Sequence, residues 1–445
     1  MPSPNLLRVG PLLLLLCGCV GLGAQAPGDT HVTRFQGDKT GAVSLTFDDG
    51  IITQFTVARP ILDSLDLTAT FYVITGKIRG AAQGRFIGRN REDILREASE
   101  TPTDSTNFFE RASLIAFTGT SEAVDYHSRA GAAYEAGRIE QAHRLIDEAY
   151  AKLLTGKLRD TDAVVFHDNA VDTTTWRDLR KYQADGHEIA SHTVTHPRLA
   201  VLDEANLLYE LEQSRDDIER FLGTRATFSA EGPYGTEDER VMEYAHRFYP
   251  ALRNRMPAPY LAELNRGSRM APGAQEKEYV QWQRGPVDGT SLATMKSWID
   301  TTLAHDNIWL VEVFHGVDDY GWAARPGEEL EEYFTFIKQH EDRLWIAPFA
   351  TVTKYIRERQ AATLSSQLSD GTIKVTHSAG EDTTVYDIPL TFRTYVPPDW
   401  TTASLSVIGS DAPERSCEVR SGPSGTYITY DLAPGTPGWL IRKGK

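Results

Sequence analysis

Residues 42–50 read AVSLTFDDG, and this stretch decides how the rest of the chain is interpreted. Its first residues are apolar or β-prone and end in Phe47, which predicts a short buried strand. The strand stops at two adjacent carboxylates, Asp48 and Asp49, and then at Gly50, a residue that accepts backbone angles others avoid. The carboxyl ends of strands carry the chemistry in parallel α/β sheets and barrels, so we expect both carboxylates to belong to a site.

A second polar cluster lies at residues 186–197, GHEIASHTVTHP. His192 and His196 are four residues apart, and on a helix or a tight turn this spacing places both imidazoles on one side, close enough to share a metal ion. Neighbouring carboxylates repel, so one of Asp48 and Asp49 is expected to gain a cation or a proton. Two histidines and one aspartate would leave coordination positions open, as is typical of a catalytic metal site. Either cluster alone is usually incidental, whereas the two together are far more specific.

The pair of motifs TFDDG and SHTVTH resembles the first two motifs of the polysaccharide deacetylase family, the NodB homology domain of carbohydrate esterase type. The resemblance covers most of residues 40–360. It implies a distorted (β/α) barrel of about seven strands, a divalent metal, most often Zn²⁺, and the removal of acetyl groups from sugars. By position it implies that Asp48 is the general base and that Asp49, His192 and His196 are the metal ligands.

The third motif of the family falls at residues 228–235, FSAEGPYG. Pro233, Tyr234 and Gly235 match it, and the resemblance assigns the backbone N–H of Tyr234 to the oxyanion; backbone donors suit this task because they are fixed before charge develops. The arginine that orients the base in the family has no counterpart, and Ser229 and Glu231 occupy its neighbourhood.

The fifth motif matches a buried strand, IWLVEVF at residues 308–314, which ends at His315. The resemblance implies that His315 is the general acid, a role that suits histidine because its pKa lies near neutrality. Asp318 and Asp319 follow closely and are candidates either for biasing its charge or for solvated turn residues. The fourth motif, an acidic residue near a tryptophan, has no clean match, and Asp288 is a weak candidate for it.

Composition and charge limit which classes of partner and which cellular locations are expected. The 445 residues carry a net charge of −16, which argues against nucleic acid as a partner. Residues 1–26 resemble an export signal whose apolar run is too short to span a bilayer. Cys19 lies in a stretch that resembles a lipoprotein box, which would give a lipid anchor to the membrane; ordinary cleavage near residues 24–26 is the alternative. We therefore expect an exported protein that is periplasmic, anchored to the outer membrane or extracellular, without an internal disulfide framework.

The chain divides into a barrel domain over residues 27–362, interrupted by a helical insertion over residues 77–162, and a C-terminal domain over residues 363–445. Within the barrel, strands are also predicted at residues 68–74, 187–191, 225–228 and 344–347. The insertion is rich in Ala, Glu and Arg, and it is expected either to pack on the barrel rim or to form a wall over the cleft. The last segment switches to a period of two, which predicts a small β-sandwich acting as a passive cap or a sugar-binding module.

These features predict a metal-dependent hydrolase that removes N-acetyl groups from a poly- or oligosaccharide. An esterase that removes O-acetyl groups from xylan-like or other glycans would use the same residues. A third possibility is a carbohydrate-binding relative that keeps the metal and has lost catalysis, because the arginine of the third motif is missing.

Overall fold

The barrel domain is built on a nine-stranded sheet in which all strand pairs are parallel. The computed structural model describes residues 25–160, 174–235, 238–254, 262–264, 266, 268–274 and 277–444. The strand order is β6-β5-β4-β3-β2-β9-β8-β7, and β10 pairs with β2 outside this path. The strands are β2 (Gly41–Phe47), β3 (Thr70–Val73), β4 (Glu188–Ser191), β5 (Ser229–Ala230), β6 (Ala251–Leu252), β7 (Ala262–Leu264), β8 (Val280–Arg284), β9 (Ile308–Phe314) and β10 (Leu344–Ile346).

Strand β2 lies in the middle of this sheet, and all of its residues are buried. One edge pairs with β9 along its length, whereas the other edge pairs first with β10 at Gly41 and then with β3 at Thr46. Because β10 and β3 share one edge of β2, the sheet curls instead of staying flat. The predicted distorted (β/α) barrel is confirmed, and among the described residues no strand pair closes it between β6 and β7.

Helices surround the sheet and bury its apolar side chains in a common core. Aromatic rings dominate the centre of this core, where Phe47 stacks on Phe71 and Phe314 at centroid distances of 5.2 and 5.3 Å. The helices of the barrel are α1 (Arg59–Ser64), α6 (Trp176–Ala184), α7 (Glu204–Leu222), α8 (Glu239–Ala245), α9 (Leu292–Leu303), α10 (Gly327–Lys338) and α11 (Phe349–Ala361).

The strand predicted at residues 225–228 is wrong. Helix α7 ends at Gly223, whose φ of 91° turns the chain, and Thr224–Thr227 form a 3₁₀ turn. The chain enters the sheet only afterwards, at Ser229–Ala230. The β-branched residues therefore complete a turn instead of a strand.

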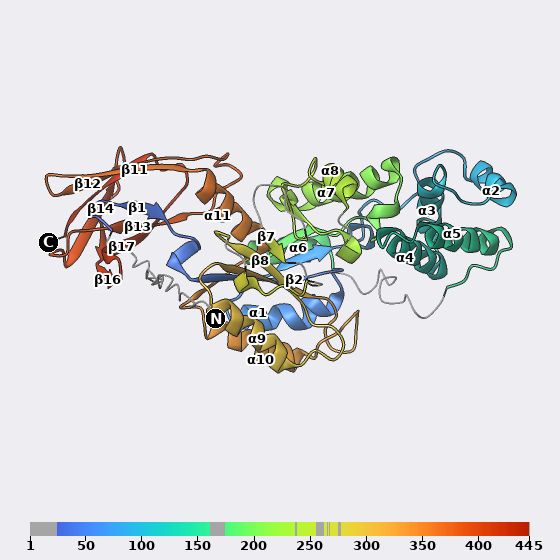
Figure 1. The fold of residues 1–445 in the computed structure, drawn as a ribbon, viewed down its shortest axis with the longest axis horizontal. Coiled ribbons are helices and arrows are strands. Elements are labelled where there is room, and N and C mark those ends of the chain that lie inside the picture. Colours follow the sequence, from blue (N-terminus) through green and yellow to red (C-terminus); the bar gives the residue numbers. More distant parts are fainter. Residues whose placement is uncertain are drawn as a thin grey trace, which may run out of the picture.

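The helical insertion has a hydrophobic core of its own. It consists of α2 (Arg91–Glu100), α3 (Phe108–Ala116), α4 (Ser121–Glu135) and α5 (Ile139–Leu154). Its buried residues pack on one another, and Val201 of the barrel joins the same cluster. Figure 1 shows the insertion at one end of the molecule and the C-terminal sheets at the other, with the barrel between them.

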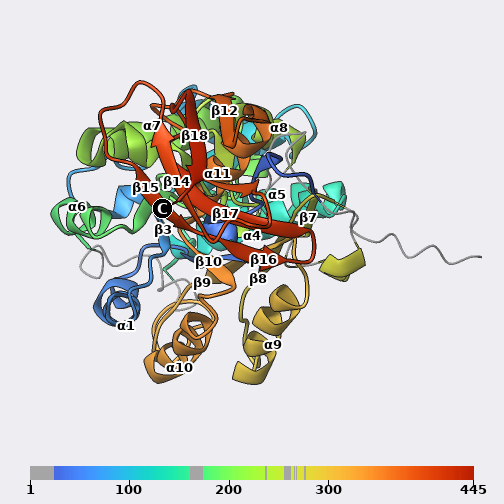
Figure 2. The ribbon, with the colours of Figure 1, turned by 90° about the vertical axis from the view of Figure 1, so that its left-hand side faces the viewer.

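Two antiparallel sheets form the predicted β-sandwich (Figure 2). Their strands are β11 (Thr363–Ser369), β12 (Thr372–Ser378), β18 (Gly438–Lys443), β14 (Thr402–Val407) and β15 (Arg415–Glu418) in one sheet, and β1 (Thr30–Val32), β13 (Leu390–Tyr395), β17 (Gly425–Leu432) and β16 (Arg420–Gly422) in the other. Strand β1 precedes the barrel in the chain, yet it pairs with β13. Tyr355 of α11 and Trp439 of β18 belong to one buried cluster, so the sandwich packs against this helix.

Within the described residues, no helix is long and apolar enough to cross a membrane. Cys417 is a buried free thiol. The predicted export signal, including Cys19, lies before residue 25 and outside the part of the chain that the structure describes.

Candidate active site at the carboxyl ends of the strands

The carboxyl end of β2 turns sharply and lifts two carboxylates above the sheet. Asp49 and Gly50 both adopt positive φ angles, 77° and 65°. A side chain at Gly50 would place its Cβ 2.9 Å from the Val73 side chain, so the turn requires glycine for space as well as for conformation. The backbone N–H of Asp48 donates to the carbonyl of Phe314 at 2.9 Å, which ties the start of the turn to β9.

Asp49, His192 and His196 converge on one point. Their ligand atoms all lie within 4.8 Å of one another, and Asp49 Oδ1 is 3.7 Å from His192 Nε2 and 3.4 Å from His196 Nε2. Asp49 Oδ1 is buried and has no hydrogen-bond donor. The His192 Nδ1–H donates to the carbonyl of Glu231 at 3.0 Å, so that His192 Nε2 presents its lone pair to the same point.

The two histidines are carried by a loop after β4 and not by a helix. Thr193 and His196 have positive φ angles, and the His196 N–H donates to Thr193 Oγ1 at 3.1 Å. The buried carboxylate of Glu210, from α7, accepts hydrogen bonds from the N–H groups of Val194 and Thr195 at 2.8 and 2.9 Å. These bonds fix the strained loop, and strained backbone of this kind is concentrated at functional sites.

Asp48 is held by Arg253, a residue that the sequence analysis did not identify. Arg253 Nη1 and Nη2 donate to the two carboxylate oxygens of Asp48 at 2.5 and 2.7 Å, and both side chains are buried. Burial alone would raise the pKa of Asp48, but the guanidinium of Arg253 lowers that pKa well below its ordinary value. Asp48 is therefore charged and fixed in orientation. The only signal in the sequence is the place of Arg253 directly after the apolar pair that forms β6.

Glu231, one of the two residues in the neighbourhood of the missing arginine, is bound to the same guanidinium. Its Oε1 lies 3.0 Å from Arg253 Nη2 and accepts a hydrogen bond from the Asn254 side chain, whereas its buried Oε2 has no partner. Burial raises the pKa of Glu231 to about 7. Arg253, directly after β6, thus places beside Asp48 a positive charge that residues 228–235 do not supply.

His315 also lies beside Asp48. Its Nε2 is 3.5 Å from Asp48 Oδ2, and the ring of Trp322 meets it nearly at right angles with a centroid distance of 4.5 Å. Burial lowers the pKa of His315 to about 3, although the charge of Asp48 acts in the opposite direction. Asp318 does not serve His315, because its Oδ1 accepts the N–H of Gly327 at 2.9 Å.

Tyr234 lies beside the histidine pair. Its φ of 62° places it in the left-handed region, and its ring centroid is 4.7 Å from that of His196. The guanidinium of Arg198 lies over the same ring at 4.6 Å.

A pocket of about 490 Å³ brings these residues together. All six residues singled out by the motifs line it, and α4 of the insertion contributes to its wall. Asp288 is not among the lining residues. The lining consists of Asp48, Asp49, Val124, Asp125, Ser128, His192, His196, Arg198, Glu231, Tyr234, Gly235, Arg266, His315 and Trp322.

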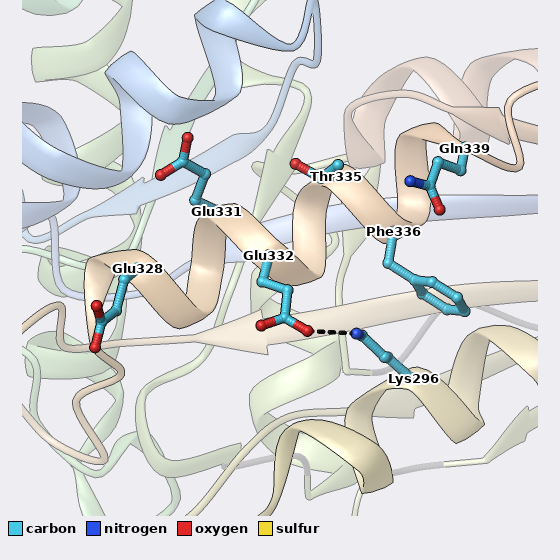
Figure 3. A pocket seen from close by; sticks show the side chains of 7 residues that line it. All are labelled: Lys296, Glu328, Glu331, Glu332, Thr335, Phe336 and Gln339. Carbon is cyan, nitrogen blue, oxygen red and sulfur yellow. Dashed lines mark hydrogen bonds and ion pairs between the residues drawn. The ribbon is translucent and has the colours of Figure 1, made fainter.

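A second hollow lies between α9 and α10 and has a different character (Figure 3). Its carboxylates lie along α10, and that of Glu332 pairs with Lys296 at 2.7 Å. Among the described residues, the one group of side chains that could hold a metal is Asp49, His192 and His196, which lies in the first pocket. The first pocket is therefore the candidate active site.

The insertion is attached directly to the loop that carries the histidines. His127 of α4 accepts the N–H of Arg198 on Nε2 at 3.1 Å and binds the carbonyl of Ala112 through Nδ1 at 3.0 Å. The side chain of Arg198 pairs with Glu135. Gly131 permits this approach, because a Cβ at this position would collide with the Arg198 side chain.

Comparison with known proteins agrees with the motifs. Residues 147–249 match the family model described as polysaccharide deacetylase. A gellan lyase from a Bacillus species is 27% identical over 262 residues, which cover 54% of this chain but only 10% of that relative. Among solved structures, a Bacillus subtilis peptidoglycan deacetylase is 13% identical with a TM-score of 0.31, covering 72% of this chain and 93% of that one.

The CE4 domain of a multidomain xylanase, from the hindgut metagenome of Trinervitermes trinervoides, is 11% identical with a TM-score of 0.32, covering 70% of this chain and 89% of that one. The family model matches the segment that carries both histidines and Tyr234. The resemblance predicted from the motifs is thus confirmed over residues 147–249, where this chain matches the polysaccharide deacetylase family model.

Proposed function

We propose that the protein hydrolyses N-acetyl groups of an acetylated poly- or oligosaccharide with the help of a divalent metal ion. One observation carries the proposal: a buried trio of Asp49, His192 and His196 lies beside a charged Asp48 in the same pocket. The match to a segment of a gellan lyase supports a polysaccharide as the substrate class. Such a substrate would also agree with the export signal predicted in residues 1–26.

The trio fits a metal such as Zn²⁺ on its donor set. Imidazole nitrogen and carboxylate oxygen are the donors that zinc takes, and three protein ligands are typical of catalytic sites. The buried Asp49 Oδ1 without a hydrogen-bond donor and the orientation of His192 are both accounted for by such an ion. Bound there, the ion would polarise the acetyl carbonyl and lower the pKa of a water molecule.

The protein's own groups would then handle the protons. Asp48, kept ionised by Arg253, takes a proton from the attacking water, and the backbone N–H of Tyr234 donates to the oxygen on which negative charge develops. His315 is neutral at rest, because burial lowers its pKa to about 3. Asp48 Oδ2 lies 3.5 Å from His315 Nε2, so His315 can receive the proton from Asp48 and deliver it to the leaving nitrogen. Acetate and a free amine on the sugar result.

The decisive experiment measures acetate release from N-acetylated chito-oligosaccharides and from O-acetylated xylan, with zinc, cobalt or manganese supplied. The Asp48→Asn variant should lose turnover and keep its metal, because Asp48 is not a member of the trio. Faster release from xylan would replace the N-deacetylase with an O-acetyl esterase. No release from any substrate, together with measurable sugar binding, would replace the enzyme with a binding protein.

A further inference from the structure

We propose that Trp322 is a stacking platform for a sugar ring of the substrate, placed next to the residue that carries the acetyl group. This inference rests on the proposed function and adds the part of the pocket that recognises the sugar. Trp322 lines the pocket beside His315, and 47% of its surface is exposed. Its ring stands nearly perpendicular to that of His315, at 78°, and a contact of this geometry covers at most one face of the indole.

The loop that displays Trp322 is held in one conformation. The Gly316 N–H donates to the carbonyl of Trp322 at 3.0 Å, and the Arg325 N–H donates to the carbonyl of Gly316 at 3.1 Å. Ala323, the next residue after Trp322, has a φ of 47°. This angle is rare for a residue that is neither glycine nor an Asx residue, and such strain persists only where the surroundings enforce it. The indole is therefore presented by a rigid segment and not by a mobile one.

The exposed large aromatic side chains of the described residues lie in this pocket. Among the described residues, the large apolar side chains that are exposed include two aromatic ones, Tyr234 and Trp322, and both line the pocket. The ring of Tyr234 already contacts His196 and the guanidinium of Arg198. Trp322 is thus the aromatic surface left for a ligand, whereas the sandwich domain exposes no comparable ring in its described residues.

A carbohydrate ring is the occupant that fits this surface. The pocket is rich in charged groups, so an apolar ligand would leave those groups without partners. A pyranose offers C–H bonds to the indole face and hydroxyl groups to the carboxylates. A rigid aromatic side chain contributes contact area at low entropic cost, because it has been ordered before binding.

The test compares Trp322→Ala and Trp322→Phe with the wild-type protein. Kinetics on chito-oligosaccharides of two to six sugars, or on acetylated xylo-oligosaccharides if only these are cleaved, should show a KM raised about tenfold in Trp322→Ala. The kcat should stay within about twofold, and Trp322→Phe should recover most of the loss. Ile408→Ala removes an exposed apolar side chain from the sandwich and should behave as wild type.

Fluorescence provides a readout that does not need turnover. The chain has eight tryptophans, and Trp322 is the one with an exposed side chain. Titration with deacetylated oligosaccharide should change the emission of the wild type and leave that of Trp322→Phe unchanged. An unchanged KM in Trp322→Ala, or a fall in kcat with a shifted pH profile and an unchanged KM, would overturn the platform. If the wild type releases no acetate, the deacetylase proposal fails, and the titration still decides whether Trp322 binds sugar.

Discussion

Arg253 donates to both carboxylate oxygens of Asp48, although the strand that it follows, β6, lies four positions away from β2 in the sheet. In a flat sheet these strands would be about 19 Å apart, because neighbouring strands are spaced by about 4.8 Å. One side chain could not bridge that distance. The ion pair therefore depends on the curl of the sheet, which brings the Asp48 carboxylate and the Arg253 guanidinium together.

Replacement of Arg253 should lower acetate release and leave metal binding by Asp49, His192 and His196 intact. Arg253→Lys keeps the charge and loses the two-pronged geometry, so we expect acetate release to fall on the order of 100-fold. Arg253→Gln should be less active still, because Asp48 loses its counter-charge and its pKa rises. Metal content, measured after dialysis, should match that of the wild type in both variants. Wild-type activity in Arg253→Lys would show that the orientation of Asp48 does not matter.

Metal removal should lower stability as well as activity. Burial raises the pKa of Asp49 to about 6, and a cation would relieve the cost of its buried charge. Adding Zn²⁺ to protein stripped by a chelator should raise the thermal midpoint. At a Zn²⁺ concentration of 100 times the dissociation constant, the free energy of unfolding should increase by about 2.7 kcal/mol. Asp49→Asn should abolish this response. Asp125→Asn, which alters a pocket carboxylate outside the trio, should retain it; a response that survives in Asp49→Asn would place the metal elsewhere.

The contact between the insertion and the histidine loop can be tested at Gly131. In Gly131→Val the new side chain meets the stem of Arg198 and the side chain of Val201, so α4 and the loop after His196 must separate. We expect kcat/KM to fall about tenfold or more, because small displacements at a site are costly. Ala132→Val changes the exposed neighbour and is the matched control. Equal activity in both variants would show that the insertion packs beside the loop without positioning it.

A buried carboxyl of β9 should make the stability fall as the pH rises from about 4.5 to about 8. Glu312 of β9 accepts a hydrogen bond from the Tyr333 hydroxyl, and burial raises its pKa to about 8, above the ordinary 4.5. Between these two pH values the folded chain holds a proton that the unfolded chain has lost, so the free energy of unfolding falls as pH rises. Denaturant titrations at pH 5 and pH 9 should show a loss on the order of a few kcal/mol in the wild type.

The Glu312→Gln variant separates this carboxyl from all other titrating groups. It keeps the shape of the side chain and cannot ionise, so its stability should change less between pH 5 and pH 9 than that of the wild type. If the free energy of unfolding changed with pH by the same amount in both proteins, Glu312 would not be the cause of the pH dependence.

The sequence was sufficient for the elements that rest on local pattern. The buried strand before Asp48, the strand before His315 and the histidine pair could all be located, since strand ends and motif spacing are local properties. Arg253 could not be found, because its contact with Asp48 arises from the curl of the whole sheet and the strand before it is only two residues long. The hydrogen bond between His127 and Arg198 was missed for a similar reason: the two residues are 71 positions apart and nothing local links them.

The pairing of β1 with β13 has a consequence for how this chain is made. Thr30 lies opposite Thr394, so an edge of the sandwich emerges from the ribosome 364 residues before its partner. Contacts of such long range form late in folding, and an unpaired edge strand is open to association with other chains until then. A truncation after residue 362 would leave β1 without β13 and expose the buried cluster around Tyr355. The barrel domain is therefore expected to express well only when the C-terminal domain is synthesised with it.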